Sequence, residues 1–449
     1  MTFDTVIHNG LIVTLNSRGD VITGGAVCVR DGRIAQVAAQ PKGDLPAAQS
    51  IDACGGIVMP GLVNSHTHLP MSLFRGLADD LPLADWLKHH IFPVEAAHLH
   101  PQSIRTGTLL ACAEMLLSGT TACCDGYFFE NEVACAVEES GMRAVLAQGV
   151  IDFPAPGVPN PSENVSAAAA FTERWHSRSA RITPSIFCHS PYTCSQKTLR
   201  AAKAAADARG LLFQIHVAET RQERQRSEAE NGCSPVAYLK RVGILDEKTL
   251  LVHAVWIDDA DIDIIRASGA KVSHPPESNM KLAAGIAPVP EMIAAGITVG
   301  LGTDGCASNN DLDMFAEMDT AAKVHKVRKM DPAVMDAAGV LRMATIEGAR
   351  AVGLADRVGS IEVGKQADLV VVDTAVPRLT PLYLPESHLV YAASGADVRH
   401  VMVAGKLLVR DRRLLGLDLE GILKDARDIG ARIAMAGYAK KGFRLKAED

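Results

Sequence analysis

Through the middle of the chain, short apolar runs rich in β-branched residues alternate with longer stretches of helical pattern. Eight runs are predicted strands: Ile57–Ser65, Gly119–Asp125, Arg143–Val150, Arg181–His189, Leu211–Val217, Thr249–Val255, Ala270–His274 and Thr298–Thr303. The segments between them suit helices, such as Pro101–Ser118, which begins with proline, and Asn131–Glu139, which Gly141 closes. Repeated strand–helix units predict an α/β fold, a TIM (β/α)8 barrel with insertions over residues 58–361.

A doubly wound open sheet is the alternative to this barrel. It is disfavoured because neither a G-x-G-x-x-G nor a G-x-x-x-x-G-K-[ST] pattern follows an early strand. A barrel places its active site at the carboxyl ends of its strands, so residues that follow the eight runs are the candidates for chemistry.

Both ends of the chain show another pattern, in which short β-rich runs are separated by turns. Asn9-Gly10 and Asp31-Gly32 are turn signals in the first segment, and the pattern returns in Ile361–Asp373 and Val398–Val409. We therefore expect residues 1–57 and 362–449 to form one small, discontinuous β domain, a β-sandwich beside the barrel.

Composition narrows the class of protein. The 449 residues are 48% apolar, which excludes a disordered or collagen-like chain, and the net charge of −7 comes without a basic block that would bind nucleic acid. The N-terminus lacks a signal-peptide pattern and no window is apolar enough to span a membrane, so a cytoplasmic protein without a membrane partner is expected. The ten cysteines contain no C-x-x-C pair, which argues against a thiolate zinc site and against secreted disulfides.

The first predicted strand ends in His66-Thr67-His68, where strand alternation turns both imidazoles to the same side. This spacing suits a metal site but is weak alone, because a chain with 15 histidines shows it by chance. His98-Leu99-His100 has the same spacing, but no strand leads into it and Pro101 follows, so a solvated helix end is expected there.

Polar residues at the other strand ends strengthen the first pair. His189 ends the fourth predicted strand, His216 the fifth and His253 the sixth, and Asp304 follows the eighth. A lone histidine on an apolar strand is more often a core residue, but these residues would all meet at one rim of the barrel.

A mononuclear metal site needs three or four nitrogen and oxygen ligands from different strands. His66, His68, His216 and Asp304 supply them, and the bridging lysine of a binuclear site is missing from the fourth strand. One Zn2+ per chain is expected, with Fe2+ or another divalent ion as the alternative. Such an ion makes hydroxide available near neutral pH.

Glu219 lies three residues beyond His216 and is placed to take a proton from the metal's water and pass it to the substrate. The alternative is a surface glutamate that opens a helix at Thr220. His253 and Asp304 would hydrogen-bond the hydroxide from the other side, and Cys306 is expected to be a bystander.

The chain resembles the amidohydrolase superfamily, and within it the 5′-methylthioadenosine/S-adenosylhomocysteine deaminases and their chlorohydrolase-like relatives. The resemblance covers nearly the whole chain and rests on these motifs: Pro60–His68, Arg75–Leu83 with Trp86, His189–Ser195, His216–Thr220, Ser273–Leu282, Leu301–Asn310 and Gly364–Val371. It implies a barrel flanked by a small β domain made from both termini.

The resemblance also implies roles for individual residues. Zinc would be held by the four ligands above, with Glu219 as proton shuttle and His253 supporting the hydroxide. Glu95 resembles the carboxylate that grips the ribose hydroxyls, with a helix-surface charge as the alternative, and His189 resembles the residue that hydrogen-bonds the purine. Trp86 and Gln148 are expected among the substrate contacts, and the protein is expected to be a homo-oligomer.

One departure from the family bears on the substrate. Members that take S-adenosylhomocysteine hold its carboxylate with arginine near the end of the third strand and in the loop beyond. Here Gln148 stands near the end of that strand and the loop from Phe153 to Asn164 has no basic residue, so adenosine or 5′-methylthioadenosine is expected to be preferred.

The expected function is zinc-dependent hydrolytic deamination of an adenine nucleoside (adenosine, 5′-methylthioadenosine or S-adenosylhomocysteine) to the inosine analogue and ammonia. Two alternatives stay open. One is an aminohydrolase or chlorohydrolase acting on another heteroaromatic ring, such as guanine, a pterin or an s-triazine. The other is a non-catalytic binding protein on a degenerate barrel, which the complete ligand set disfavours.

Overall fold

The computed structural model describes residues 2–39 and 45–437. Parts of the expected terminal β domain, at residues 1, 40–44 and 438–449, therefore lie outside the described residues. No helix within the described ranges is long and apolar enough to cross a membrane.

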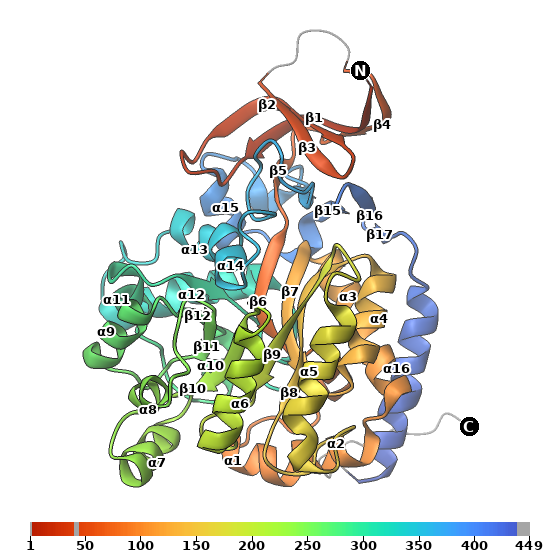
Figure 1. The fold of residues 1–449 in the computed structure, drawn as a ribbon. Helices are drawn as coiled ribbons and strands as arrows, with labels where there is room; N and C mark the ends of the chain where they lie inside the picture. The colour runs from red at the N-terminus through yellow and green to blue at the C-terminus, as the bar shows by residue number, and fades with distance from the viewer. Residues whose placement is uncertain (1, 40–44, 438–449) are drawn as a thin grey trace.

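Eight parallel strands form the barrel (Figure 1), as the apolar runs predict. They are β6 (Leu62–Thr67), β7 (Thr120–Tyr127), β8 (Arg143–Val150), β9 (Ile182–Cys188), β10 (Phe213–Val217), β11 (Thr249–His253), β12 (Lys271–His274) and β13 (Val299–Leu301). The two end strands meet: Ser65 Oγ donates to the Leu301 carbonyl at 2.8 Å, and the Thr303 N–H donates to the His66 carbonyl at 3.1 Å. This contact closes the sheet, so the open doubly wound alternative is excluded.

Helices surround the barrel. They are α1 (Leu83–Trp86), α2 (Phe92–His98), α3 (Pro101–Leu117), α4 (Glu130–Ser140), α5 (Asn164–Trp175), α6 (Gln196–Asp207), α7 (Arg221–Asn231), α8 (Pro235–Arg241), α9 (Asp259–Ser268), α10 (Pro276–Lys281), α11 (Val289–Ala294), α12 (Met314–Lys329), α13 (Ala337–Met343), α14 (Ile346–Ala351), α15 (Pro385–Tyr391) and α16 (Leu419–Met435). A 3-10 turn, η1 (Leu69–Phe74), follows β6, and a π-helical turn, η2 (Leu87–Ile91), joins α1 to α2.

The predicted helix signals are found where the sequence places them. Pro101 begins α3, and the His100 side chain caps that helix by accepting a hydrogen bond from the Ser103 N–H. Gly141 ends α4 with a φ of 82°, a conformation that glycine adopts without strain. His98 and His100 therefore belong to helix ends, as expected, and not to a metal site.

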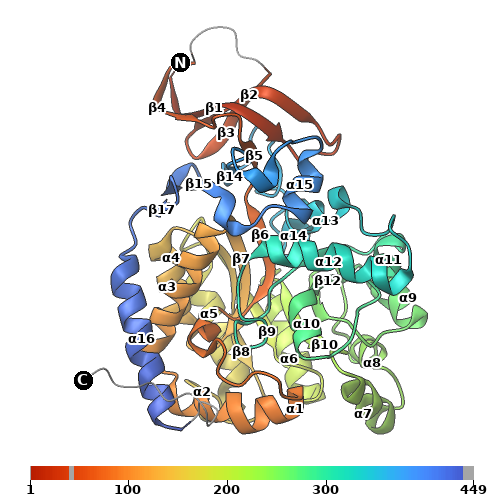
Figure 2. The ribbon, with the colours of Figure 1, turned by 180° about the vertical axis from the view of Figure 1, so that it is seen from behind.

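The small β domain is a single mixed sheet of nine strands within the described residues. Its strands are β1 (Phe3–Val13), β2 (Val21–Arg30), β3 (Arg33–Ala38), β4 (Ala47–Asp52), β5 (Ile57–Pro60), β14 (Leu369–Val372), β15 (Val398–Val403), β16 (Lys406–Arg410) and β17 (Arg413–Leu414). The two terminal segments join where β5 pairs in parallel with β1 and antiparallel with β14. This sheet lies at the end of the barrel opposite α1 and α2 (Figures 1 and 2).

The small sheet and the barrel are joined without a linker. Strand β5 continues into β6 through Gly61, where a Cβ atom would lie 2.0 Å from Thr121 Oγ1, so only glycine fits. At the other end of the chain, α16 leaves the small sheet and lies along the barrel beside α3 (Figure 2). Because β5 pairs within the small sheet, the boundary expected between residues 57 and 58 falls inside β5, and the two sheets separate at Gly61. We propose that the boundary expected between residues 361 and 362 separates them on the other side, with α16 as a C-terminal addition to the barrel.

Apolar side chains fill the half of the barrel that faces the small sheet. Val63, Ala122, Cys124, Val145 and Leu250 form one buried cluster with residues of and after α14. Polar side chains follow at the carboxyl ends of the strands, where the active sites of such barrels lie. The site is therefore built at the rim covered by α1 and α2.

Candidate active site

Four buried side chains converge at the carboxyl rim of the barrel. His66 and His68 lie at the end of β6, His216 lies in β10 and Asp304 follows β13. Asp304 Oδ1 lies 3.4 Å from His66 Nε2 and 3.3 Å from His68 Nε2, and the Nε2 atoms of His66 and His216 are 3.1 Å apart. One ligand atom from each residue lies within 4.8 Å of all the others.

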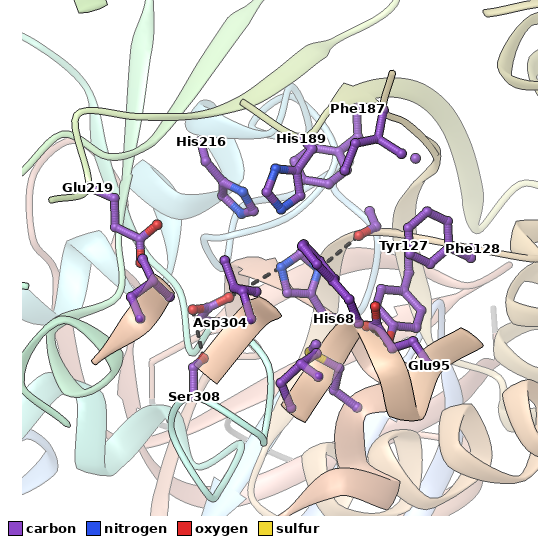
Figure 3. Close-up of a pocket in the computed structure, with 18 of the residues that line it drawn as sticks. His68, Glu95, Tyr127, Phe128, Phe187, His189, His216, Glu219, Asp304 and Ser308 are labelled. Carbon is purple, nitrogen blue, oxygen red and sulfur yellow. Dashed lines mark hydrogen bonds and ion pairs between the residues drawn. The ribbon is translucent and has the colours of Figure 1, made fainter. Parts of the chain in front are cut away.

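Neighbouring groups orient these ligand atoms. His68 Nδ1 lies 2.8 Å from the Gly126 carbonyl, which leaves Nε2 to face the cluster. The hydroxyls of Ser278 and Ser308 both donate to Asp304 Oδ2 at 2.7 Å, which leaves Oδ1 for the cluster. Figure 3 shows Asp304 between Ser308 and His68.

Burial sets the charges of these ligands. It lowers the pKa of His66 to about 4 and also lowers the pKa values of His68 and His216, so the imidazoles are neutral at pH 7. Burial alone would raise the pKa of Asp304, but the neighbouring histidines outweigh it and hold this pKa well below its usual range. Three neutral imidazoles and one carboxylate, with lone pairs converging on one point, fit a single divalent ion such as zinc.

Glu219 and His253 lie beside this cluster. Both line the cavity, and His253 Nε2 is 3.9 Å from Glu219 Oε2. Burial raises the pKa of Glu219, which suits a group that exchanges protons near neutrality. Burial alone would lower the pKa of His253, but the carboxylates of Glu219 and Asp304 outweigh it and raise this pKa.

Glu219 is not a surface residue, because only 8% of it is exposed. A helix does begin after Thr220, and the Thr220 side chain caps it by accepting a hydrogen bond from the Glu223 N–H. The residue of this helix start that turns its carboxylate toward the preceding backbone is Glu223, not Glu219. Glu223 accepts from the N–H groups of Ala218 and Glu219 at 2.8 and 2.9 Å, so it fixes the backbone that carries Glu219.

Glu95 lies on the other side of the cluster from Glu219 in the view of Figure 3. It is 3% exposed and accepts a hydrogen bond from the Tyr127 hydroxyl. Burial raises the pKa of Glu95 to about 7. Glu95 is therefore a cavity residue, and the alternative of a helix-surface charge does not hold.

His189 and Trp86 also line the cavity, together with the aromatic rings of Phe92, Tyr127 and Phe187. His189 Nδ1 lies 3.0 Å from the Thr193 hydroxyl, and burial lowers the pKa of His189 to about 3, which keeps the ring neutral. The surroundings of the metal cluster are thus apolar and aromatic with a few polar groups, as in small-molecule sites.

Gln148 is not among the residues that line this cavity. It lies in β8 with its side chain toward the start of α4, where Oε1 accepts from the Glu130 N–H at 3.1 Å. The structure therefore gives Gln148 no contact with the cavity, although Gly149 and Val150, which follow it, line the wall.

Sequence reasoning assigned no role to several residues that shape the site. Asn279 Oδ1 lies 2.9 Å from His253 Nδ1, and Ser278, Ser308 and Tyr127 hold Asp304 and Glu95. All except Tyr127 fall within the motifs Ser273–Leu282 and Leu301–Asn310, so the family resemblance already pointed to the segments that contain them. Most of their partners could not be read from the sequence, because the contacts of Asn279, Ser278 and Tyr127 join residues at least 26 positions apart.

A parallel barrel with three buried histidines and an aspartate at its carboxyl rim defines a metal-dependent hydrolase. The chain belongs to the amidohydrolase family, whose sequence model matches residues 57–408.

Named relatives cover nearly the whole chain. The 5-methylthioadenosine/S-adenosylhomocysteine deaminase of Syntrophobacter fumaroxidans is 46% identical over 433 residues, 96% of this chain and 98% of that protein. The 5′-deoxyadenosine deaminase of Methanosarcina mazei is 43% identical over 426 residues, 94% of this chain and 97% of that protein. The crystal structure of an adenosine deaminase from Xanthomonas campestris with bound zinc matches with a TM-score of 0.94 and 39% identity, over 97% of this chain and 99% of that chain.

Proposed function

We propose that this protein is a zinc-dependent aminohydrolase that converts adenine nucleosides to the inosine analogues and ammonia. The observation that carries the proposal is the placement of Glu219 and Glu95 in one cavity with the buried ligands His66, His68, His216 and Asp304. The names of the relatives and the zinc in the Xanthomonas campestris structure support it.

His66, His68, His216 and Asp304 would hold the zinc ion, which would supply Lewis acidity and would lower the pKa of a water molecule to about 7. Glu219 takes the proton that this water loses as its oxygen bonds to C6 of the adenine ring, and delivers it to N1. His253 hydrogen-bonds the attacking oxygen, and Asn279 at 2.9 Å orients the His253 ring. The proton that remains on the C6 hydroxyl is then transferred to the amino group, the C6–N6 bond breaks, and ammonia leaves while C6 becomes a carbonyl carbon.

Substrate contacts are proposed for three further residues. The Glu95 carboxylate offers two acceptors for the adjacent ribose hydroxyls, and Tyr127 orients it. His189, neutral because of its burial, hydrogen-bonds a purine nitrogen, and Trp86 covers the nucleoside. Gln148 is not among these contacts, because its side chain faces α4.

Ammonia release from a panel of compounds tests this function. We expect the highest kcat/KM among adenosine, 5′-methylthioadenosine and S-adenosylhomocysteine, with loss of activity on chelation and recovery with Zn2+. A higher kcat/KM for guanine, a pterin or a chlorinated s-triazine would favour the heteroaromatic alternative. Binding of these compounds without release of ammonia would indicate a non-catalytic binding protein.

Two broader expectations from the sequence are also proposals. We propose a cytoplasmic location, because none of the ten cysteines forms a disulfide. We propose a homo-oligomer, because apolar side chains such as Val327, Met330, Tyr383 and Leu384 are largely exposed. Fractionation and light scattering, respectively, test them.

A further inference from the structure

A second cavity lies outside the one that holds the candidate active site. It is much larger, about 810 Å³ against about 70 Å³. The two cavities share five lining residues, Leu83, Leu87, Phe92, Tyr192 and Leu282. They are therefore neighbours across a wall of mostly apolar side chains, and we call the second one the outer cavity.

Positive charge exceeds negative charge around the outer cavity. Its wall carries Lys88, Arg221, Arg226 and Lys281 against two acids, Asp80 and Glu223. The Glu223 oxygens accept the backbone N–H groups of Ala218 and Glu219, and Glu223 forms no ion pair with a cation of the wall within the described residues.

Two of the four cations already have acidic partners. Arg226 Nε lies 2.9 Å from Glu230 Oε1, and Lys281 Nζ lies 2.7 Å from Asp79 Oδ1. Arg221 and Lys88 form no ion pair within the described part of the chain. The outer cavity therefore holds two cations that are available to an anion.

Arg221 is held in place by a ring contact. Its guanidinium lies over the Trp256 ring, 5.7 Å from the ring centre, and the Trp256 indole N–H donates to the Ala284 carbonyl at 2.6 Å. A guanidinium that packs against an aromatic face keeps the N–H donors in its own plane free and loses less freedom when it binds an anion.

We propose that the outer cavity is a subsite for a carboxylate or phosphate at the far end of a substrate's 5′ substituent, held by Arg221 and Lys88. This inference rests on the proposed function. An adenine nucleoside in the inner cavity would direct a flexible apolar linker past Leu87, Phe92 and Tyr192, which suit methylene and thioether groups. The anion would then meet the two cations without help from β8 or the loop after it.

This inference differs from the expected preference for small 5′ groups, and the experiment below decides between the two. That preference was expected because the sequence has no cation at Gln148 or in the loop from Phe153 to Asn164. Lys88 and Arg221 instead come from η2 and from the start of α7. These two elements are far from the third barrel strand in the sequence.

The test compares three adenine compounds on the holoenzyme. S-adenosylhomocysteine carries a carboxylate on a long linker, adenosine 5′-monophosphate carries its phosphate directly on the 5′ oxygen, and 5′-methylthioadenosine carries no anion. Arg221→Gln should lower kcat/KM for S-adenosylhomocysteine about 10-fold more than for 5′-methylthioadenosine, as expected for loss of a charge-assisted hydrogen bond. Lys88→Gln should act in the same direction, and added salt should weaken the wild-type preference.

Arg209→Gln is the matched control, because Arg209 is an exposed arginine that lines neither cavity. Calorimetry of the deaminated products tests the subsite without turnover. Arg221→Gln should weaken binding of the product of S-adenosylhomocysteine about 10-fold more than binding of the product of 5′-methylthioadenosine, and we call this the selectivity ratio. The subsite is overturned if Arg221→Gln leaves the ratio unchanged while the wild type deaminates adenosine normally, and the proposed function then stands. It is also overturned if only the 5′-monophosphate responds to Arg221→Gln, since the anion would then sit beside the ribose. If the wild type deaminates no adenine nucleoside, the proposed function fails and the subsite with it.

Discussion

Arg143 and Asp368 form a buried ion pair that joins the barrel to the terminal sheet. Arg143 Nε and Nη2 donate to Asp368 Oδ2 and Oδ1 at 2.7 and 3.0 Å, and each side chain is 1% exposed. Asp368 Oδ1 also accepts from the Ala404 N–H at 2.7 Å, so the carboxylate connects β8 with the start of β14 and the end of β15, two of the four C-terminal strands that the structure describes. This pair fixes the barrel on the small sheet at the end away from the active site.

Breaking this pair from one side should destabilise the protein strongly. Arg143→Met leaves a buried carboxylate without its cation and should lower the free energy of unfolding by about 3–5 kcal/mol. Denaturant unfolding measures the change. Arg105→Met, which removes an exposed ion pair with Glu139, is the control and should cost about 1 kcal/mol or less. A small effect of Arg143→Met would mean that water enters the junction.

The purified protein should contain about one zinc ion per chain, since the four ligands suit one ion. His66→Ala or Asp304→Ala should remove both zinc and turnover and should lower Tm, because the ion links three strands. Elemental analysis and thermal unfolding measure these effects, with the exposed His176→Ala as control. Two tightly held ions per chain would contradict this prediction.

Glu219→Gln keeps the size of the side chain but removes the proton acceptor. We expect kcat to fall about 10²- to 10⁴-fold while zinc content stays unchanged. Glu228→Gln, on the exposed face of α7, is the matched control. A Glu219→Gln enzyme with nearly wild-type kcat would show that another group carries the proton.

Glu95→Ala tests whether this carboxylate recognises the ribose. It should raise KM for adenosine far more than KM for any small aromatic amine that is turned over, because only the nucleoside has hydroxyls to hold. Tyr127→Phe should raise KM for adenosine about 10-fold with a smaller effect on kcat, since Glu95 loses the donor that orients it. Glu173→Ala, on an exposed face of α5, is the control. Equal losses for both substrate types would contradict ribose recognition.

Glu277 and Glu317 should make stability depend on pH. Burial raises the pKa of Glu277 to about 7, and burial together with the neighbouring Glu277 carboxylate raises the pKa of Glu317 well above its usual range. A carboxyl with a raised pKa binds its proton more tightly in the folded state, so its contribution to stability is lost as pH rises from about 4.5 toward 7. Glu277→Gln keeps an acceptor for the Thr320 hydroxyl and should stabilise the protein at pH 8 but not at pH 4.5. Equal effects of the substitution at both pH values would contradict this assignment.

The strands and metal ligands were predictable because parallel strands place their carboxyl ends at one rim. His66, His68, His216 and Asp304 follow directly from that geometry. The orientation of the Gln148 side chain could not be predicted from the sequence. Whether a β8 side chain faces the cavity or a helix depends on packing against α4, which the residue type does not reveal. Asn279 and Glu223 were missed for a related reason, since their roles arise from hydrogen bonds made only in the folded chain.

The passage of β5 into β6 through Gly61 limits how this protein can be rearranged. The strand that ends in His66 and His68 begins in the small sheet, where β5 pairs with β1 and β14. A barrel excised or transplanted without the terminal segments would leave that strand without two of its neighbours. The two sheets are therefore not interchangeable modules, and a chimera must keep both ends of the chain to keep its metal ligands in register.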